Sequence, residues 1–199
     1  MNDAVVIQQV HPGKGMEPLL MLVHSRHVSY CTVHEMDYWC FYSDVTSTWP
    51  PENGGWAKLL LIRKALQAGY TFVIWLDADT LIKDLTTDLR EGCPLEDVGA
   101  VEFIRNTWGI HRNVGALYLR NTTRNNYTID MWLSCYPGTP PQHEQAVCNE
   151  SGSVTIPPKW NYVASRCTPV TDPVVLGFHD LRNISDKLGA MKQELAQCQ

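Results

Sequence analysis

The chain has 199 residues, of which 44% are hydrophobic, so it is long enough to bury a substantial core. Its 16 lysines and arginines against 21 aspartates and glutamates give a formal net charge of -5, which argues against a nucleic-acid partner. No apolar run approaches membrane-spanning length, and the first ten residues lack the basic and apolar regions of a signal peptide. We therefore expect a single soluble, cytoplasmic domain over residues 1–199.

The cysteines support the same compartment. All 7 are scattered, with no Cys-x-x-Cys pair and an odd total, as is typical of reduced thiols in a cytosolic protein. Four Asn-x-Ser/Thr sequons, at Asn121, Asn126, Asn149 and Asn183, would matter only in a secretory compartment. Without a signal peptide we interpret these sequons as chance matches.

The first part of the chain alternates predicted strands and helices. Residues 4–10 (AVVIQQV) form a short strand, and Pro18 opens a helix with apolar residues at helical spacing. Residues 38–43 (YWCFYS) are aromatic-rich and strand-like, and residues 56–68 form an amphipathic helix. The run 71–76 (TFVIWL) has no polar alternation, which indicates a strand covered on both faces.

The remainder continues the pattern. Further strands are predicted at residues 98–104, 114–119, 153–158 and 173–179, and helices at residues 127–135 and 185–198. This order predicts an α/β domain with a mixed, mostly parallel central sheet flanked by helices. The ligand site of such a domain lies beyond the carboxyl ends of its strands.

Two aspartates, Asp77 and Asp79, follow the strand 71–76 in the sequence TFVIWLDADTLIKD. Residues two apart on a strand point to the same face, so the two carboxylates would converge where the strand ends. Their charges repel unless a cation lies between them, and carboxylate oxygens suit Mg²⁺, Mn²⁺ or Ca²⁺. On this interpretation Asp79→Asn relieves repulsion and leaves the apo protein as stable or slightly more stable. The alternative is an aspartate-rich turn that caps the next segment.

Several short motifs, taken in order, resemble one family of sugar transferases. They are HVSYCTVHEMDYW, GWAKLLLIRKAL, the Asp-x-Asp strand, NVGALYLRNT, HEQAV, IPPKWNYV and VVLGFHD. Together they resemble the galactosyl, mannosyl and xylosyl transferase family. The resemblance implies a Rossmann-like GT-A domain, a nucleoside-diphosphate sugar donor with UDP favoured over GDP, a glycan or other hydroxyl acceptor, and retention of anomeric configuration.

The resemblance also implies a metal site. His179 matches the family's carboxyl-terminal histidine and would join Asp77 and Asp79 as the third ligand, and an imidazole beside carboxylates favours Mn²⁺ over Mg²⁺. Asp79 counts among the catalytic residues, because the ion would act as a Lewis acid on the departing diphosphate. Arg182 or Lys187 would pair with phosphate oxygens. The alternatives are a hydrogen-bonded strand-end histidine and, for Lys187, a solvated face.

Donor-side residues follow from the same resemblance. Lys58, in the Trp-x-Lys helix, would reach the donor sugar or diphosphate, and Trp56 would form a pocket wall. Asn113 would bind sugar hydroxyls, while Gly115 would let the backbone approach the ligand. The alternatives are an exposed helix lysine, a packed tryptophan and a turn asparagine.

The remaining candidates concern the acceptor and the nucleotide base. Gln145 would contact the sugar, and Glu144 would polarise the acceptor hydroxyl or stabilise an oxocarbenium-like transition state. The same segment also resembles a plain helix start, where glutamate is favoured. Gln8 or Gln9 would lie near the nucleotide base, because they end the first strand.

Two other functions stay open on the sequence. One is a sugar nucleotidyltransferase, for which VHPGKGMEP with Lys14 offers a weak phosphate loop. The other is a lectin that uses Asp77 and Asp79 to hold Ca²⁺. We expect no stem or anchor like those of Golgi family members, so the chain would be either a free-standing or an excised catalytic domain. Small free-standing transferases of the kind carried by large algal viruses, acting in the host cytoplasm, fit it better.

Overall fold

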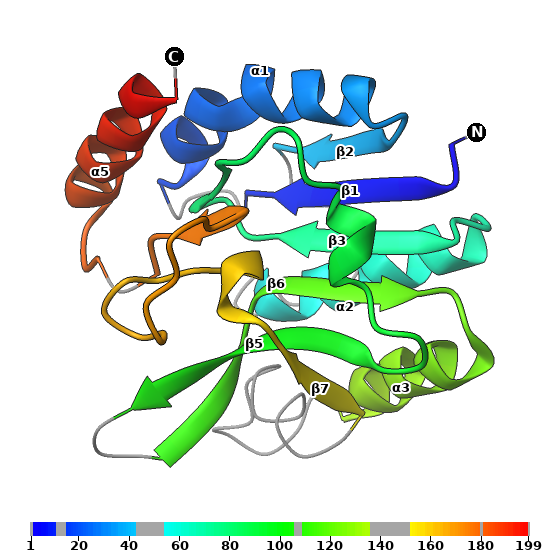
Figure 1. Ribbon diagram of the computed structural model, residues 1–199. Helices are drawn as coiled ribbons and strands as arrows, with labels where there is room; N and C mark the ends of the chain where they lie inside the picture. Colours follow the sequence, from blue (N-terminus) through cyan, green and yellow to red (C-terminus); the bar gives the residue numbers. More distant parts are fainter. Residues whose placement is uncertain are drawn as a thin grey trace.

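The computed structural model describes residues 2–10, 15–42, 54–105, 109–135, 152–179 and 181–198. Within them, a six-stranded sheet has the order β2-β1-β3-β6-β5-β7, and β4 pairs with β8 in a small second sheet (Figure 1). The large sheet contains β1 (Ala4–Gln9), β2 (Asp37–Phe41), β3 (Phe72–Leu76), β5 (Val98–Arg105), β6 (Gly109–Arg120) and β7 (Ser153–Ile156). The small sheet contains β4 (Thr80–Ile82) and β8 (Val175–Gly177).

The helices are α1 (Glu17–Val33), α2 (Gly54–Gln67), α3 (Thr123–Ser134) and α5 (Ile184–Gln197), with short 3-10 turns η1 (Leu89–Gly92) and η2 (Pro158–Trp160). Parallel pairing joins β1 to β2, β1 to β3 and β5 to β7, whereas β6 runs antiparallel to β3 and to β5. The predicted α/β class with a mixed, mostly parallel sheet is therefore confirmed.

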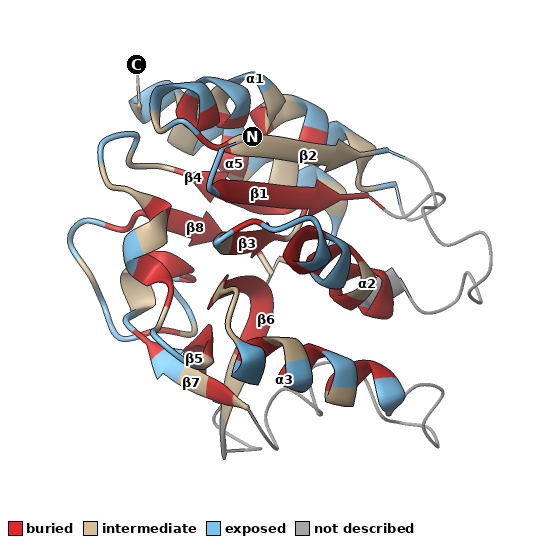
Figure 2. Cartoon of the chain, turned by 90° about the vertical axis from the view of Figure 1, so that its right-hand side faces the viewer, coloured by how far each residue is buried: buried red, intermediate tan, exposed pale blue. Residues whose placement is uncertain are grey.

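Alternate residues of the central strands enter two different cores. Val73 and Trp75 of β3 pack with α2 and α3, whereas Ile74 and Leu76 pack in the cluster that includes residues of α1 and η1. Figure 2 shows β1 buried along its length, with α2 and α3 together on one side of the sheet, and β3 is buried from its second residue on. The prediction that the run 71–76 is covered on both faces is confirmed for residues 73–76, whereas Thr71 is exposed and Phe72 half-buried.

Several element boundaries differ from the predicted ones. The helix predicted at residues 127–135 begins at Thr123, because Thr122 caps it by accepting a hydrogen bond from the backbone N–H of Asn125 over 3.1 Å. β6 begins at Gly109, before the predicted strand 114–119. β4 was not predicted, because three residues are too few to show a periodic pattern.

Two general predictions can be checked on the described residues. Their cysteines, which are Cys31, Cys40, Cys93, Cys135, Cys167 and Cys198, are all free thiols. Among the helices that the structure describes, none combines the length and hydropathy that a membrane span needs.

Candidate functional site

Asp77 and Asp79 lie in a tight turn between β3 and β4. The backbone N–H of Thr80 donates to the carbonyl of Asp77 over 3.1 Å, and the Thr80 hydroxyl donates to the same oxygen over 2.7 Å. The sequence-based geometry is therefore corrected: β3 ends at Leu76, and the carboxylates come together through a β-turn rather than through the pleat of a strand.

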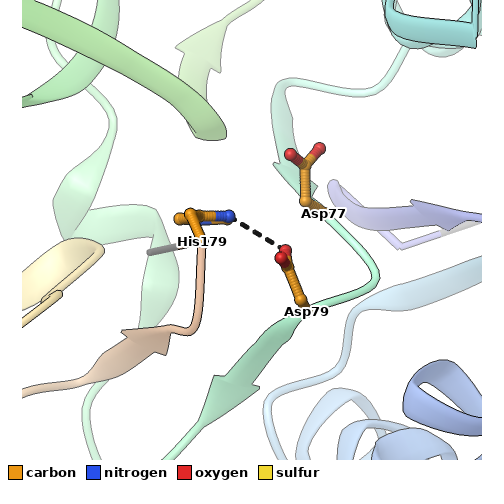
Figure 3. Close-up of side chains that lie close together, drawn as sticks. All are labelled: Asp77, Asp79 and His179. Carbon is orange, nitrogen blue, oxygen red and sulfur yellow. Dashed lines mark ion pairs between the residues drawn. The ribbon is translucent and has the colours of Figure 1, made fainter. Parts of the chain in front are cut away.

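The small sheet brings His179 to this turn. Because Thr80 of β4 pairs with Gly177 of β8, the ladder continues to a bond from the backbone N–H of Phe178 to the carbonyl of Asp79, at 3.0 Å. His179 follows directly, and its Nδ1 lies 2.9 Å from Oδ1 of Asp79 (Figure 3). A ligand atom from each of Asp77, Asp79 and His179 lies within 4.8 Å of the others.

This donor set fits a divalent cation. Two carboxylates and one imidazole are the ligand types that suit Mn²⁺, and the oxygens also suit Mg²⁺. Among the described residues, Nε2 of His179 and Oδ1 of Asn161 are buried polar atoms without a hydrogen-bond partner. Both atoms lie beside Gly177, and they mark where a bound group or a water would complete the hydrogen bonding of the site.

Positive charges hold Asp79 in its ionised form. Burial alone would raise the pKa of Asp79, but the ion pairs with His179 and Lys187 outweigh it and hold this pKa below its ordinary value. Burial would lower the pKa of His179, yet the neighbouring Asp79 carboxylate keeps it raised. Asp79 is therefore a carboxylate, the protonation state that a metal ligand requires.

Asp77 is held by residues of α2 and β3. The Lys58 ammonium donates to Oδ1 of Asp77 over 3.1 Å, and the indole N–H of Trp75 donates to the same oxygen over 2.6 Å. Lys58 also donates to the carbonyl of Val114 over 3.0 Å and is only 4% exposed, so it is not the exposed lysine of the alternative interpretation. Trp56 is 3% exposed in the core beside α2, which matches its packing alternative.

The imidazole of His179 lies between two glycines. A Cβ at Gly115 of β6 would overlap the ring, and a Cβ at Gly177 of β8 would lie 2.8 Å from two of its atoms. Gly115 thus makes room for His179, a role beyond the predicted backbone approach to a ligand. A glycine inside a strand signals such a close approach, so Gly177, in VVLGFH, was available to sequence reasoning.

Asn113 and Asn161 join β6 to the turn after η2. Oδ1 of Asn113 accepts from the backbone N–H of Gly115 over 2.8 Å and from the side-chain amide of Asn161 over 2.9 Å. Asn161 is fully buried. Asn161 lies in the motif IPPKWNYV, but sequence reasoning assigned it no role, because its partner Asn113 is distant in the chain.

The other predicted residues are dispersed. Gln8 is fully buried and bonds to protein groups, so its amide does not face a nucleotide base. Gln9 ends β1 and is 9% exposed, and Arg182 is exposed just before α5. Glu144 and Gln145 lie outside the described residues, so their acceptor-side roles stay predictions.

We expect the free energy of unfolding at mildly acidic pH to depend on His27, a buried residue of α1. Burial, assisted by the charge of Arg26, lowers the pKa of His27 from 6.5 to about 3. The unfolded chain takes up a proton on His27 below about pH 6.5, whereas the folded protein keeps it neutral. Folding stability should therefore fall by up to about 1.4 kcal/mol per pH unit as the pH drops from 6.5.

Urea unfolding between pH 4.5 and 6.5 tests this slope, and His27→Asn should flatten it. His179 does not contribute to the slope in this pH range. Because its pKa is raised in the folded protein, its stabilisation is fully present below its unfolded pKa and is lost only as the pH rises through its folded pKa. The depressed carboxylates Asp79 and Asp84 lose stabilisation only below their ordinary pKa of 3.8. An equally steep slope in His27→Asn would contradict the prediction.

The chain has the fold of the GT-A glycosyltransferases, with an aspartate turn after β3 and a histidine after β8. Residues 2–98 match the model of the galactosyl transferase GMA12/MNN10 family. Galactomannan galactosyltransferase 1 of Cyamopsis tetragonoloba is 29% identical over 61% of this chain, but the match spans only 29% of that relative's length.

Solved structures agree on the fold. A glycosyltransferase involved in the glycosylation of the major capsid of PBCV-1 superposes with a TM-score of 0.75 at 15% identity, over 96% of this chain and 98% of that chain. GlyE of Streptococcus pneumoniae TIGR4 gives 0.54 at 12% identity, over 98% and 65%. The fold is therefore that of the GT-A glycosyltransferases, and the predicted resemblance to the galactosyl transferase family is confirmed over residues 2–98.

Proposed function

We propose that this chain is a metal-dependent glycosyltransferase that moves a hexosyl or pentosyl group from a nucleoside-diphosphate sugar to a hydroxyl of a glycan or glycoconjugate. The observation that carries the proposal is the meeting of Asp77, Asp79 and His179 at the carboxyl end of β3, where an α/β sheet binds its ligands. The proposal takes residues 1–199 as one catalytic domain.

The three side chains would hold Mn²⁺ or Mg²⁺. When bound, such an ion supplies Lewis-acid stabilisation to a departing diphosphate. The chain itself adds two ammonium groups, since Lys58 contacts Asp77 and Lys187 contacts Asp79. Positive charge fixed beside the leaving group lowers the barrier to its departure, because negative charge develops there in the transition state.

The finer features of the reaction are proposed from the family resemblance. The donor is a UDP-sugar, and transfer retains the anomeric configuration. Glu144 and Gln145 act on the acceptor side, and Asn113 faces the donor sugar. Arg182, just before α5, would pair with phosphate oxygens of the donor. The free thiols of the described cysteines support a reducing, cytoplasmic setting.

A thermal-shift titration tests the proposal. A UDP-sugar with Mn²⁺, at about 100 times its dissociation constant, should stabilise the protein by roughly 2.7 kcal/mol, which raises the melting temperature by roughly 5 to 10 °C. Mn²⁺ or nucleotide alone should give a smaller shift, because the positive ion that Asp77, Asp79 and His179 would hold and the negative diphosphate would each strengthen the binding of the other.

Two results would contradict this function. Stabilisation by a free glycan with Ca²⁺, without any nucleotide, would indicate a lectin. Release of UTP when pyrophosphate is added to UDP-glucose would indicate a nucleotidyltransferase. Slow release of UDP, by transfer or hydrolysis, is the outcome that supports a transferase.

A further inference from the structure

A hydrogen-bond network centred on two fully buried side chains contacts the aspartate turn. Gln8 of β1 and His27 of α1 are both 0% exposed, and Nδ1 of His27 lies 2.7 Å from Oε1 of Gln8. The Tyr38 hydroxyl of β2 donates to the same oxygen over 2.7 Å. The network thus joins two strands of the large sheet to the helix that covers them.

The network reaches both ends of the turn. The side-chain amide of Gln8 donates to the carbonyl of Asp77 over 3.1 Å, and the backbone N–H of Ile82 donates to Nε2 of His27 over 3.0 Å. The neighbouring Arg26 donates to the carbonyl of Ile82 over 2.8 Å. Hydrogen bonds therefore hold the segment 77–82 at both ends, at the carbonyl of Asp77 and at the backbone N–H and carbonyl of Ile82.

The protons of the network are fully determined. A backbone N–H can only donate, so Nε2 of His27 must accept from Ile82, and the ring hydrogen must be on Nδ1. Nδ1 therefore donates to Oε1 of Gln8, which fixes the amide of Gln8 with its N–H groups toward Asp77. Every bond depends on the others, so the loss of one partner leaves a buried polar group unsatisfied.

We infer that Gln8 and His27 are positioning residues that clamp the aspartate turn at both ends and so hold Asp77 and Asp79 in the geometry that binds a divalent cation. The inference rests on the proposed function of this turn. Neither residue touches the ion or the substrates, and both act through the backbone of residues 77–82. The nucleotide-base role predicted for Gln8 is replaced by this one.

The test measures binding of Mn²⁺ alone, followed by the electron paramagnetic resonance of free Mn²⁺, well below each variant's melting temperature. His27→Asn keeps a donor near the position of Nδ1 but loses the acceptor for Ile82. His27→Asn and Gln8→Leu should each weaken Mn²⁺ binding about 10- to 100-fold, the loss typical when support for metal ligands is removed.

A matched control separates positioning from stability. Ile129→Ala removes a fully buried side chain of α3, in the core with α2 and away from the turn, and should lower the melting temperature but leave Mn²⁺ affinity within about twofold. If His27→Asn does not fold, Tyr38→Phe removes one of the two donors to Gln8. It should weaken Mn²⁺ binding about two- to tenfold, a smaller loss than direct removal of a clamp residue.

The outcomes distinguish the two proposals. If the unaltered protein binds no Mn²⁺, the proposed function fails, and the clamp fails with it. If the unaltered protein binds Mn²⁺ and the folded clamp variants bind it equally well, the clamp alone is overturned, and the network serves only the core. Weakened binding that Ile129→Ala does not reproduce supports the clamp.

Discussion

Asp79→Asn should abolish Mn²⁺-dependent binding of a UDP-sugar and lower transfer or hydrolysis by about 100-fold or more, the loss expected when a preorganised electrostatic contact disappears. The apo protein should also become less stable, by about 3 kcal/mol, because Lys187 and His179 lose the carboxylate that pairs with them in a buried site. These ion pairs replace the expectation from sequence that the variant is as stable or slightly more stable. Calorimetric titration and urea unfolding measure the two effects.

Asp84→Asn is the matched control for charge removal. Asp84 accepts hydrogen bonds from Thr86 and Thr87 in an exposed turn beyond β4, outside the metal cluster. This variant should lose some stability and keep Mn²⁺-dependent nucleotide binding. A destabilised Asp79→Asn that still binds UDP with Mn²⁺ would contradict the site proposed here.

Gly115→Ala should eliminate Mn²⁺ binding through a single added methyl group. The new Cβ would overlap the imidazole of His179, so the ring would have to leave its place between Gly115 and Gly177. Overpacking of this kind also lowers folding stability, by roughly 1 to 3 kcal/mol. Metal titration and urea unfolding of the same variant give both numbers.

Gly99→Ala tests whether crowding alone explains that loss. Its Cβ, on β5, would lie 2.9 Å from side-chain atoms of Ile156 and Pro94, against 2.4 Å from His179 at Gly115, and would meet no residue of the cluster. We expect a similar loss of stability with unchanged Mn²⁺ affinity. If Gly115→Ala, like Gly99→Ala, leaves Mn²⁺ affinity unchanged, His179 is not a ligand.

Hydrophobic patterning predicted the scaffold well, because the central strands are covered on both faces. The run 71–76 could be assigned to the middle of the sheet, and the two aspartates could be placed at its end. The family resemblance added His179, which the structure brings to the aspartates. These predictions depended on residues close in sequence or on motif order.

Contacts between distant segments could not be predicted. The β4–β8 pairing involves three residues on each side, too few to show a period, yet it places His179 against Asp79. Lys187 could be proposed as a phosphate ligand but not as the partner of Asp79, since only the path of α5 decides that contact. Gln8 occupies the end of the first predicted strand whether it contacts a nucleotide base or positions the aspartate turn, so the strand pattern does not distinguish the two roles. No motif in the sequence around His27 indicates that it bonds to Gln8.

The pairing of β4 with β8 also sets the order in which the site can assemble during synthesis. Both aspartates emerge from the ribosome well before His179 and Lys187, which lie far behind them in the sequence. Until β8 is added, the nascent chain carries two neighbouring carboxylates without these two cationic partners. The complete metal site therefore forms only after β8 and α5 have packed against the aspartate turn.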